Sequence, residues 1–434
     1  MAMKESGIEW VGLIPDTWSV IPNKYVMHKE KNLCKKWTGE EVMSLTMNGV
    51  IVRDLQNPTG KMPATFDGYQ YIEDGDLLMC LFDIDVTPRC VGKVTYDGVT
   101  SPAYSNFKVH DNASRDYFYY YYLMVDNTKE LLHLAKNLRH SFTEEQLGQL
   151  KVPMPPLSEQ KVIADYLDET CSQIDEIIAE AKKSIDEYKE LKQSVIFEAV
   201  TKGLDKDVEM KNSEVEGMGF IPKKWSVVRF MKVNYVRARL GWKGLKAEEY
   251  VDVGYPFLAA YHIVNNHLCW ESLNCITKER YDESPEIKLS IGDLVLVKDG
   301  AGIGKCARID EMPLGEATVN SSLSVITPNK LLDYRYEYYY FMSPLFQNII
   351  ARLKNGMGVP HLTQESMKDI YLPLPSKKEQ QAIADYLDNK VVELDTLIAE
   401  KESLINDLEA YKGPYDTQHD GGNRVWPSLF HRDI

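Results

Sequence analysis

The sequence predicts an α+β fold in which two mixed α/β domains are separated by two long helices, packed as an antiparallel coiled coil, within a pseudo-twofold internal repeat. Three observations predict it. The ends of the two halves recur in sequence, the recurring ends carry a seven-residue apolar period, and the middles contain short strand-like and helix-like runs. With 434 residues, 44% hydrophobic and 26% charged, the chain is long and apolar enough for several folded domains.

The repeat is clearest at the ends of the halves. Residues 12–20 read GLIPDTWSV and residues 219–227 read GFIPKKWSV. Residues 153–180 align with residues 373–400 at 14 of 28 identical positions, and both copies contain ADYLD. Similar ends with divergent middles indicate that the ends share one task and that the middles perform different ones.

The repeated ends are predicted to be long helices. Ser376 and Glu379 form a capping box that signals a helix start, and Ser158 offers the corresponding start in the first copy. Apolar residues then recur every seven positions, as in a helix packed lengthwise on another. The residues expected to pack the helices together are Leu167, Ile174, Ile178, Ile185, Leu387, Leu394, Ile398 and Ile405.

The second helix is expected to end near Lys412, because a helix does not run comfortably through Gly413-Pro414. The tail, residues 413–434, loses the seven-residue pattern. We therefore expect this atypical tail to take no part in helix packing and to lack fixed structure.

The middles of the halves are predicted to be mixed α/β. The strand-like runs are 77–82, 91–96 and 294–297, and two of them precede the turn pairs Asp97-Gly98 and Asp299-Gly300. The helix-like runs are 117–122, 334–340 and 345–354, and their tyrosines are expected to lie in cores. Two short similarities connect the middles: Gly75-Asp76-Leu77 resembles Gly292-Asp293-Leu294, and Val91-Gly92-Lys93 resembles Ile303-Gly304-Lys305.

Charge argues against a simple nucleic-acid binder, because 50 Lys and Arg against 65 Asp and Glu leave a net charge of −15. Charge is, however, an average over surfaces. The segment from Gly217 to Ala247 holds eight basic residues and no acidic one, interleaved with Trp225, Tyr235 and Trp242. That segment is locally cationic.

The N-terminus lacks the basic-then-apolar layout of a secretory signal, and no apolar run approaches the roughly 20 residues of a membrane span. The seven cysteines are scattered and contain no CxxC pair, so neither a disulfide framework nor a metal site is predicted. We expect a soluble cytoplasmic protein with reduced thiols.

Motifs of catalysis are missing. Residues 296–306, LVKDGAGIGKC, lack the first glycine and the final Ser or Thr of a phosphate-binding loop, and a tight hairpin explains their glycines better. The Glu286/Lys288 pair and Asn57-Pro58-Thr59-Gly60 are too short and incomplete to indicate a nuclease or methyltransferase site. We therefore predict that the chain is not an enzyme.

A binding chemistry remains: basic side chains suited to phosphates and base edges, with amides and aromatic rings on loops over sheets. The candidates in the first half are Lys35, Lys36, Trp37, Arg53, Lys61, Arg89, Lys93, Tyr104 and Asn106. Those in the second half are Arg237, Arg239, Trp242, Lys243, Lys246, Lys298 and Lys305. For any single one of them, an ordinary solvated charge is the commoner explanation.

At the GxxPxxW segments, at the paired PxPxxxEQxxIADYLD stretches and at LKQSVIFEAVTKGL (191–204), the sequence resembles the specificity (S) subunit of type I restriction-modification systems. The resemblance covers nearly the whole chain. It implies a DNA-binding subunit for phage defence with two target recognition domains, each reading half of a bipartite site in double-stranded DNA. The implied domains are 1–152 (recognition domain 1), 153–210 (central spacer helix), 211–372 (recognition domain 2), 373–412 (distal helix) and 413–434 (tail).

The resemblance also implies partners. Two methyltransferase (M) subunits would dock on the helices, and restriction/translocase (R) subunits would complete the complex. No cofactor is expected on this chain, and S-adenosylmethionine, ATP and Mg are expected on the partner subunits. Partners would then supply part of the phosphate contact that an acidic chain lacks.

Two other classes stay open. The duplicated helices could belong to a coiled-coil scaffold that binds proteins and not DNA, for which the acidic composition is the best support. A tandem-duplicated enzyme is the weaker alternative, because the halves share no reactive residues.

Overall fold

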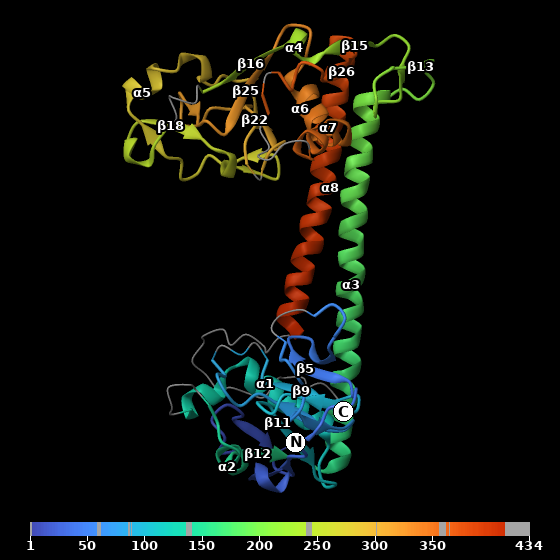
Figure 1. The fold of residues 1–434 in the computed structure, drawn as a ribbon, viewed down its shortest axis with the longest axis vertical. Coiled ribbons are helices and arrows are strands. Elements are labelled where there is room, and N and C mark those ends of the chain that lie inside the picture. The colour runs from blue at the N-terminus through green and yellow to red at the C-terminus, as the bar shows by residue number, and fades with distance from the viewer. Residues whose placement is uncertain are drawn as a thin grey trace. The chain divides into compact units, whose positions relative to one another are not determined.

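The computed structural model forms two compact units, one of residues 1–181 with 403–434 (unit 1) and one of residues 182–402 (unit 2) (Figure 1). Each unit is described by itself. The described residues are 2–58, 62–85, 87, 89–135, 141–239, 245–300, 302–355, 362–363 and 365–412. Three candidate residues, Lys61, Trp242 and Lys243, and the tail 413–434 lie outside them.

Unit 1 is built on two four-stranded sheets, ordered β4-β11-β8-β9 and β6-β5-β10-β7. Their strands are β4 (Met27–Glu30), β5 (Val42–Thr46), β6 (Gly49–Val52), β7 (Gln70–Ile72), β8 (Leu77–Met79), β9 (Val91–Lys93), β10 (Gly98–Thr100) and β11 (Ser105–Val109). Two strand pairs complete it: β1 (Met3–Glu5) with β2 (Leu13–Pro15), and β3 (Ser19–Pro22) with β12 (Lys151–Met154). The helices before the long one are α1 (Arg115–Asn127) and α2 (Glu144–Gln149).

Unit 2 repeats this plan with the sheets β16-β25-β22-β23 and β17-β21-β18-β24. Their strands are β16 (Asn234–Ala238), β17 (Tyr250–Val251), β18 (Tyr255–Leu258), β21 (Cys275–Ile276), β22 (Leu294–Val297), β23 (Cys306–Arg308), β24 (Thr318–Val319) and β25 (Leu323–Pro328). The strand pairs are β13 (Met210–Asn212) with β14 (Phe220–Pro222), β15 (Ser226–Arg229) with β26 (Tyr371–Leu374), and β19 (Ile263–Val264) with β20 (His267–Leu268). Its short helices are α4 (Phe230–Val233), α5 (Lys278–Asp282), α6 (Tyr334–Met342) and α7 (Pro344–Asn355).

The topology repeats in one sheet of each unit, since β4-β11-β8-β9 and β16-β25-β22-β23 have the same order. The other two sheets differ in strand order, but each contains one parallel pair, β5 with β10 in unit 1 and β18 with β24 in unit 2. The structure corrects one part of the sequence alignment. Lys93 pairs with Leu77 across β9 and β8, and Arg308 pairs with Leu294 across β23 and β22. Because Leu77 and Leu294 are equivalent, the counterpart of Lys93 is Arg308 and not Lys305.

The predicted hairpin strands β8, β9 and β22 are confirmed, but Asp97-Gly98 is not a hairpin turn. Gly98 is the first residue of β10, where a Cβ atom would lie 2.4 Å from the carbonyl oxygen of Glu41. Close approach of two backbones, and not turn geometry, requires this glycine.

The two long helices are α3 (Leu157–Lys202) and α8 (Lys377–Lys412). The capping box at the start of α8 is confirmed, since the Ser376 amide donates to Glu379 Oε2 at 3.0 Å and the Glu379 amide donates to Ser376 Oγ at 3.3 Å. The start assigned to Ser158 is wrong, because α3 begins at Leu157 and Ser158 lies inside its first turn. The described part of α8 runs to Lys412, and the residues beyond the predicted end lie outside the described residues.

The apolar stripes of α3 and α8 are buried within each unit, at Ile174, Ile178 and Ile405 in unit 1 and at Ile185, Leu394 and Ile398 in unit 2. Lys192 of α3 pairs with Asp395 of α8 in unit 2, and Asp175 pairs with Lys412 in unit 1. The earlier residue of α3, Asp175, pairs with the later residue of α8, Lys412. The two helices are therefore antiparallel, as predicted. Leu167 and Leu387 pack in the cores of their units, where the two domains meet their helices.

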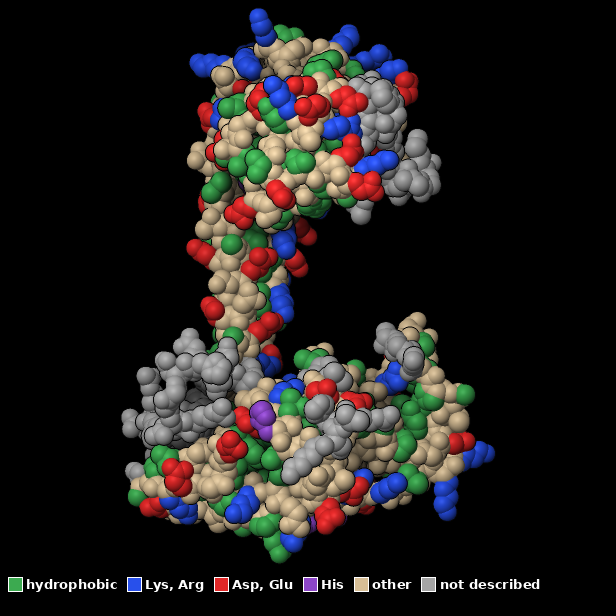
Figure 2. Space-filling view, turned by 90° about the vertical axis from the view of Figure 1, so that its left-hand side faces the viewer, with side chains coloured by type: hydrophobic (Ala, Val, Ile, Leu, Met, Phe, Trp, Pro, Cys, Tyr) green, Lys and Arg blue, Asp and Glu red, His purple; other side chains and the backbone are tan. Residues whose placement is uncertain are grey.

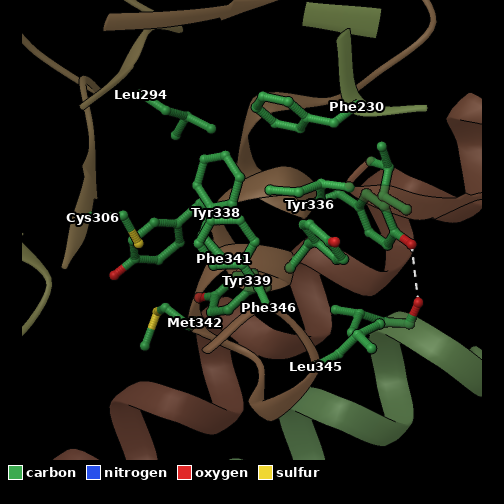
Figure 3. Packing of buried hydrophobic residues seen from close by; sticks show 14 of the residues in the cluster. Phe230, Leu294, Cys306, Tyr336, Tyr338, Tyr339, Phe341, Met342, Leu345 and Phe346 are labelled. Carbon is green, nitrogen blue, oxygen red and sulfur yellow. Dashed lines mark hydrogen bonds between the residues drawn. The ribbon is translucent and has the colours of Figure 1, made fainter. Parts of the chain in front are cut away.

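The tyrosine runs lie in cores, as expected. In unit 2 the rings of Tyr336, Tyr338 and Tyr340 from α6 pack with Phe230, Leu294 and Cys306 (Figure 3). Val200, near the end of α3, belongs to the same core, and the Tyr336 hydroxyl donates to its carbonyl oxygen at 3.0 Å. In unit 1 Tyr117, Tyr121 and Tyr122 of α1 are buried in the corresponding core.

Candidate nucleic-acid interface

On the face shown in Figure 2, Lys and Arg lie among Asp and Glu without forming one continuous basic area. On this face, contacts to an anionic partner would come from individual cations. The position of each candidate therefore decides whether it can make such a contact.

In unit 1 four candidate cations lie around the sheet β6-β5-β10-β7. Lys35 and Lys36 are exposed in the loop before β5, and neither forms an ion pair with a described residue. The residues just before them pair with β7, through Leu33 and Gln70, so these lysines lie toward that edge of the sheet. At the opposite edge, Arg53 follows the last residue of β6, and a guanidinium nitrogen of Arg89 lies 3.9 Å from the Cβ position of Gly49, where β6 begins.

The edge strand itself carries exposed apolar side chains. Ile51 and Val52 of β6 are each about two fifths exposed, and Met47 in the turn before β6 is 59% exposed. Apolar groups flanked by cations suit a surface that meets both a phosphate backbone and the methyl groups of bases. Sequence reasoning missed these residues, because an apolar strand residue is ordinarily a core residue.

Three other candidates in unit 1 are turned inward. The Asn106 side chain is buried and donates to Asp76 Oδ2 at 2.6 Å. The Trp37 indole N–H donates to the carbonyl oxygen of Glu40 at 2.9 Å, and its ring packs edge-to-face on Phe66. Tyr104 is half-buried against a small apolar cluster. Burial raises the pKa of Asp76, and the Asn106 amide opposes that rise.

In the cationic segment of unit 2, Arg237 and Arg239 are turned inward, whereas the other described basic residues are exposed: Lys223, Lys224, Arg229, Lys232 and Lys246. Arg239 is 3% exposed and donates to the Val319 carbonyl at 3.3 Å and to Ser284 Oγ at 3.3 Å. Arg237 donates to Asp293 Oδ1 at 3.0 Å. Burial lowers the pKa of Arg239. These two arginines and Asn106 form hydrogen bonds within their own domains, so we do not propose them as residues that read bases.

The remaining candidates of unit 2 are lysines on loops. Lys246 and Lys305 are exposed. Lys298 is mostly covered and pairs with Asp299 at 3.1 Å. Lys305 lies in the loop between β22 and β23. This loop belongs to the segment 296–306, which matches a phosphate-binding motif only in part. Exposed lysines on loops are suited to phosphate contact and carry little information about base sequence.

Two tyrosines that sequence reasoning left out occupy equivalent exposed positions. Tyr166 of α3 is 47% exposed and Tyr386 of α8 is 42% exposed, each in the third position of an ADYLD segment. In both copies the Ala and Leu of that segment face the core while the tyrosine faces outward. The signal was present in the sequence, because identical pentapeptides on helices present identical faces.

Among the described residues no group of three or more His, Cys, Asp or Glu side chains is placed to hold a metal ion. All seven cysteines, each in the described part, are free thiols. No helix among the described residues is both long and apolar enough to cross a lipid bilayer.

Comparison with known families decides the classification. The family described as "Type I restriction modification DNA specificity domain" matches residues 76–187 and 222–409, one region in each half. The chain belongs to this family. The matched regions include three strands of the sheet β4-β11-β8-β9 in unit 1, the whole sheet β16-β25-β22-β23 in unit 2, and most of α3 and α8. Family membership therefore rests on parts of both domains together with their helices.

Curated specificity subunits are similar over much of the chain. The MjaVIII specificity subunit of Methanocaldococcus jannaschii is 27% identical over 269 residues, which are 61% of this chain and 59% of the relative. The EcoBI specificity subunit of Escherichia coli is 24% identical over 327 residues, 71% of this chain and 67% of the relative. The match thus spans about three fifths to two thirds of the length of these specificity subunits.

Solved structures share the fold. A chain of a structure titled for complex assembly and conformational transition of the type I R-M system aligns with a TM-score of 0.68 at 14% identity, covering 92% of this chain and 96% of that chain. The HsdS subunit of Thermoanaerobacter tengcongensis aligns with a TM-score of 0.55 at 16% identity, covering 93% and 98%. At these identities the likeness concerns the fold alone, and it agrees with the predicted α+β class with two long packed helices.

Proposed function

We propose that this chain is the DNA sequence-recognition subunit of a type I restriction-modification enzyme and that it reads a bipartite target in double-stranded DNA. One observation carries the proposal. The two domains share the strand order of one sheet, and each is attached to a long helix by an equivalent Asp and Gln of that helix, while their other sheets and the loops around those sheets differ. Two domains that recognise two different half-sites require equivalent attachment to their helices together with different loops.

The base and phosphate contacts are assigned to cations at the surface. In the first domain they are the exposed Lys35 and Lys36, toward β7, and the half-buried Arg53 and Arg89, at the edge strand β6, with Lys61 as a further candidate. In the second domain they are Lys246 and Lys305, with Trp242 and Lys243 as further candidates. Arginine can contact guanine in a bidentate way, so Arg53 and Arg89 are the candidates for base recognition, and the lysines are candidates for phosphate contact.

The partners are assigned to the helices. Tyr166 and Tyr386 offer equivalent exposed aromatic side chains, which suits two copies of one partner, here two methyltransferase subunits. Restriction/translocase subunits would join this core. The chain supplies no catalytic group, and the partners supply S-adenosylmethionine, ATP and Mg. A complex that acts on cellular DNA places the chain in the cytoplasm.

The experiment is co-expression of the full chain with the methyltransferase subunit encoded beside its gene. We expect a complex of two methyltransferase subunits and one chain that methylates DNA at a two-part sequence with a fixed gap, read by sequencing of modified bases. The proposal would be contradicted if no methyltransferase subunit copurified with the chain, or if the methylated bases showed no two-part sequence. A stable complex that neither binds nor methylates DNA would favour the protein-interaction scaffold.

A further inference from the structure

Each recognition domain is joined to its long helix by the last aspartate of ADYLD. In unit 1 the Lys93 ammonium lies 2.8 Å from Asp168 Oδ1, and the Tyr120 hydroxyl donates to the same oxygen at 2.7 Å. Lys93 ends strand β9 and Tyr120 lies on α1. A strand and a helix of the domain therefore converge on one carboxylate of α3.

Unit 2 builds the same junction with different residues. The Arg308 guanidinium lies 2.5 Å from Asp388 Oδ1, and the Tyr339 hydroxyl donates to that oxygen at 2.7 Å. Arg308 ends β23, the equivalent of β9, and Tyr339 lies on α6, the equivalent of α1. Lysine in one domain and arginine in the other perform the same contact.

The cation of each junction also lies over a tyrosine ring. Lys93 Nζ is 4.9 Å from the ring centroid of Tyr119, and the Arg308 guanidinium is 5.2 Å from that of Tyr338. Tyr119 and Tyr338 each precede the tyrosine that donates to the aspartate. The ring limits the positions that the cation can take, so the contact fixes direction as well as distance.

Burial and charge are consistent with a positioning contact. The side chains of Lys93 and Arg308 are only 22% and 23% exposed. Burial acts to raise the pKa of Asp168, but the hydrogen bonds from Lys93 and Tyr120 outweigh it and lower that pKa. The carboxylate is therefore charged at neutral pH, as the contact requires.

A second attachment lies beside the first and depends on backbone atoms. Gln160 Oε1 accepts from the Ser114 amide at 2.7 Å, and Gln160 Nε2 donates to the Pro155 carbonyl at 2.8 Å. In unit 2 Gln380 accepts from the Asp333 amide at 2.7 Å and donates to the Pro375 carbonyl at 2.9 Å. Both glutamines are fully buried. They anchor the start of α1 or α6, and the aspartate then sets the direction of the domain about that anchor.

We propose that Asp168 with Lys93 and Tyr120, and Asp388 with Arg308 and Tyr339, are positioning residues that set the orientation of each recognition domain on its helix and thereby the gap between the two half-sites. This inference rests on the proposed function. Lys93 then acts on the helix and not on DNA, which reassigns a residue that sequence reasoning placed among the DNA contacts.

The test uses the complex with the methyltransferase subunit. Three variants break the junction of unit 1: Lys93→Met, Asp168→Asn and Tyr120→Phe. Lys93→Arg is the conservative rescue, since the second domain already uses arginine there. Glu176→Gln is the matched control, because Glu176 is an exposed acidic residue on the same helix with no ion pair among described residues. The readout is the methylation rate on duplexes that carry the wild-type two-part sequence with its own gap or with a gap one base pair shorter or longer.

We expect the three disruptive variants to methylate the same half-sites while their preference for the wild-type gap falls about tenfold, the change that a loss of about 1.4 kcal/mol produces. Lys93→Arg and Glu176→Gln should keep the wild-type preference. An unchanged gap preference in the assembled disruptive variants would overturn the inference, and so would a changed base in the first half-site, because Lys93 would then read DNA.

Two further observations keep the outcome interpretable. If Lys93→Met or Asp168→Asn does not assemble, Tyr120→Phe decides the question, because it removes a single hydroxyl. If the wild-type complex has no two-part sequence, the proposed function fails. If it has one with a fixed gap that the variants retain, only the present inference fails.

Discussion

The Tyr336 hydroxyl lies 3.0 Å from the carbonyl oxygen of Val200, whereas the hydroxyl of its counterpart Tyr117 has no hydrogen-bond partner within the described residues. Both tyrosines are buried at the same position of equivalent helices. Val200 belongs to the last turns of α3. The described part of α8 runs to Lys412, so the residues that correspond to the last turns of α3 lie outside the described residues.

Removing these two hydroxyls should therefore have different effects. Tyr336→Phe should destabilise unit 2 by about 1 kcal/mol, because the carbonyl groups of Val200 and Pro373 lose a donor. Tyr117→Phe should leave stability unchanged or raise it, because it removes a buried hydroxyl without a partner. Urea unfolding of both variants measures the effect, and equal losses would contradict the assignment.

Glu337 makes the stability of unit 2 depend on pH. Its carboxyl is fully buried with one hydrogen bond from Asn234, and burial raises its pKa from 4.5 to about 8. A raised pKa means that the folded state holds a proton that the unfolded state releases, so the stabilising contribution of this carboxyl should be fully present below pH 4.5 and should be lost as pH rises to 8. Thermal unfolding between pH 5 and 9 measures this loss.

Glu337→Gln should remove that pH dependence and be more stable than the wild type at pH 8, because the amide keeps the acceptor for Asn234 without the charge. Glu402→Gln, at an exposed acid on α8, is the matched control and should keep the wild-type pH profile. Parallel pH profiles for Glu337→Gln and the wild type would show that Glu337 is not the responsible group.

The packing of α8 should depend on its buried stripe and not on its exposed apolar residues. Leu394 is 2% exposed, whereas Val392, two residues before it, is 63% exposed. Leu394→Ala should cost about 2–4 kcal/mol, through lost burial and a cavity. Val392→Ala should change stability by less than about 0.5 kcal/mol. Chemical unfolding of both variants compares them, and similar losses would contradict the buried role of Leu394.

Lys35 and Lys36 should contribute affinity without base specificity. In the assembled complex, Lys35→Ala with Lys36→Ala should weaken binding to all duplexes similarly and reduce the slope of log affinity against log salt by about 2, or roughly 0.9 for each phosphate contact. Lys151→Ala, at an exposed lysine on β12, should leave the slope unchanged. Titrations at several salt concentrations test this, and a new recognised sequence would assign these lysines to bases.

The length of the helices should set the gap in the recognised sequence. Duplicating residues 182–188 of α3 together with residues 396–402 of α8 adds one heptad to both helices and preserves their apolar register. One heptad is about 10.5 Å of helix, the length of about three base pairs at 3.4 Å each. Methylated sequences from the variant should show the same half-sites with a longer gap.

A heptad added to α3 alone is the control for that experiment. It should disturb the packing on α8 and reduce assembly with the methyltransferase, because the two stripes would no longer match. An unchanged gap in the variant with both duplications would show that the helices do not act as a spacer.

The architecture could be predicted from sequence because its signals are local. The identity between residues 153–180 and 373–400 marks the repeat, and the capping box with the seven-residue period marks the long helices. The helix start predicted at Ser158 was wrong because serine matches the residue type of a cap. In the structure α3 begins at Leu157, and the position equivalent to Ser376 is Pro156.

The candidate surface could be predicted only in part, because a run of basic residues does not reveal which face of a strand is buried. Arg237 lies on β16 and Arg239 directly follows that strand, and the partner of Arg237, Asp293, lies 56 residues away in sequence. No local sequence pattern predicts an ion pair between residues so far apart in the chain. The weak similarity between Asp76 and Asp293 marked the position, and only the fold identified Asn106 and Arg237 as their partners.

Gln160 and Gln380 form hydrogen bonds with amide and carbonyl groups of the main chain. Every amino acid has the main-chain carbonyl, so these contacts depend little on side-chain identity. A recombination event at the gene segments that encode these similar helix starts could therefore exchange one recognition domain for a foreign one without a redesigned attachment, provided that the new domain brings a basic residue and a tyrosine for the neighbouring aspartate. New target preferences could then arise in a single genetic step, while the enzyme subunits that depend on this chain stay unaltered.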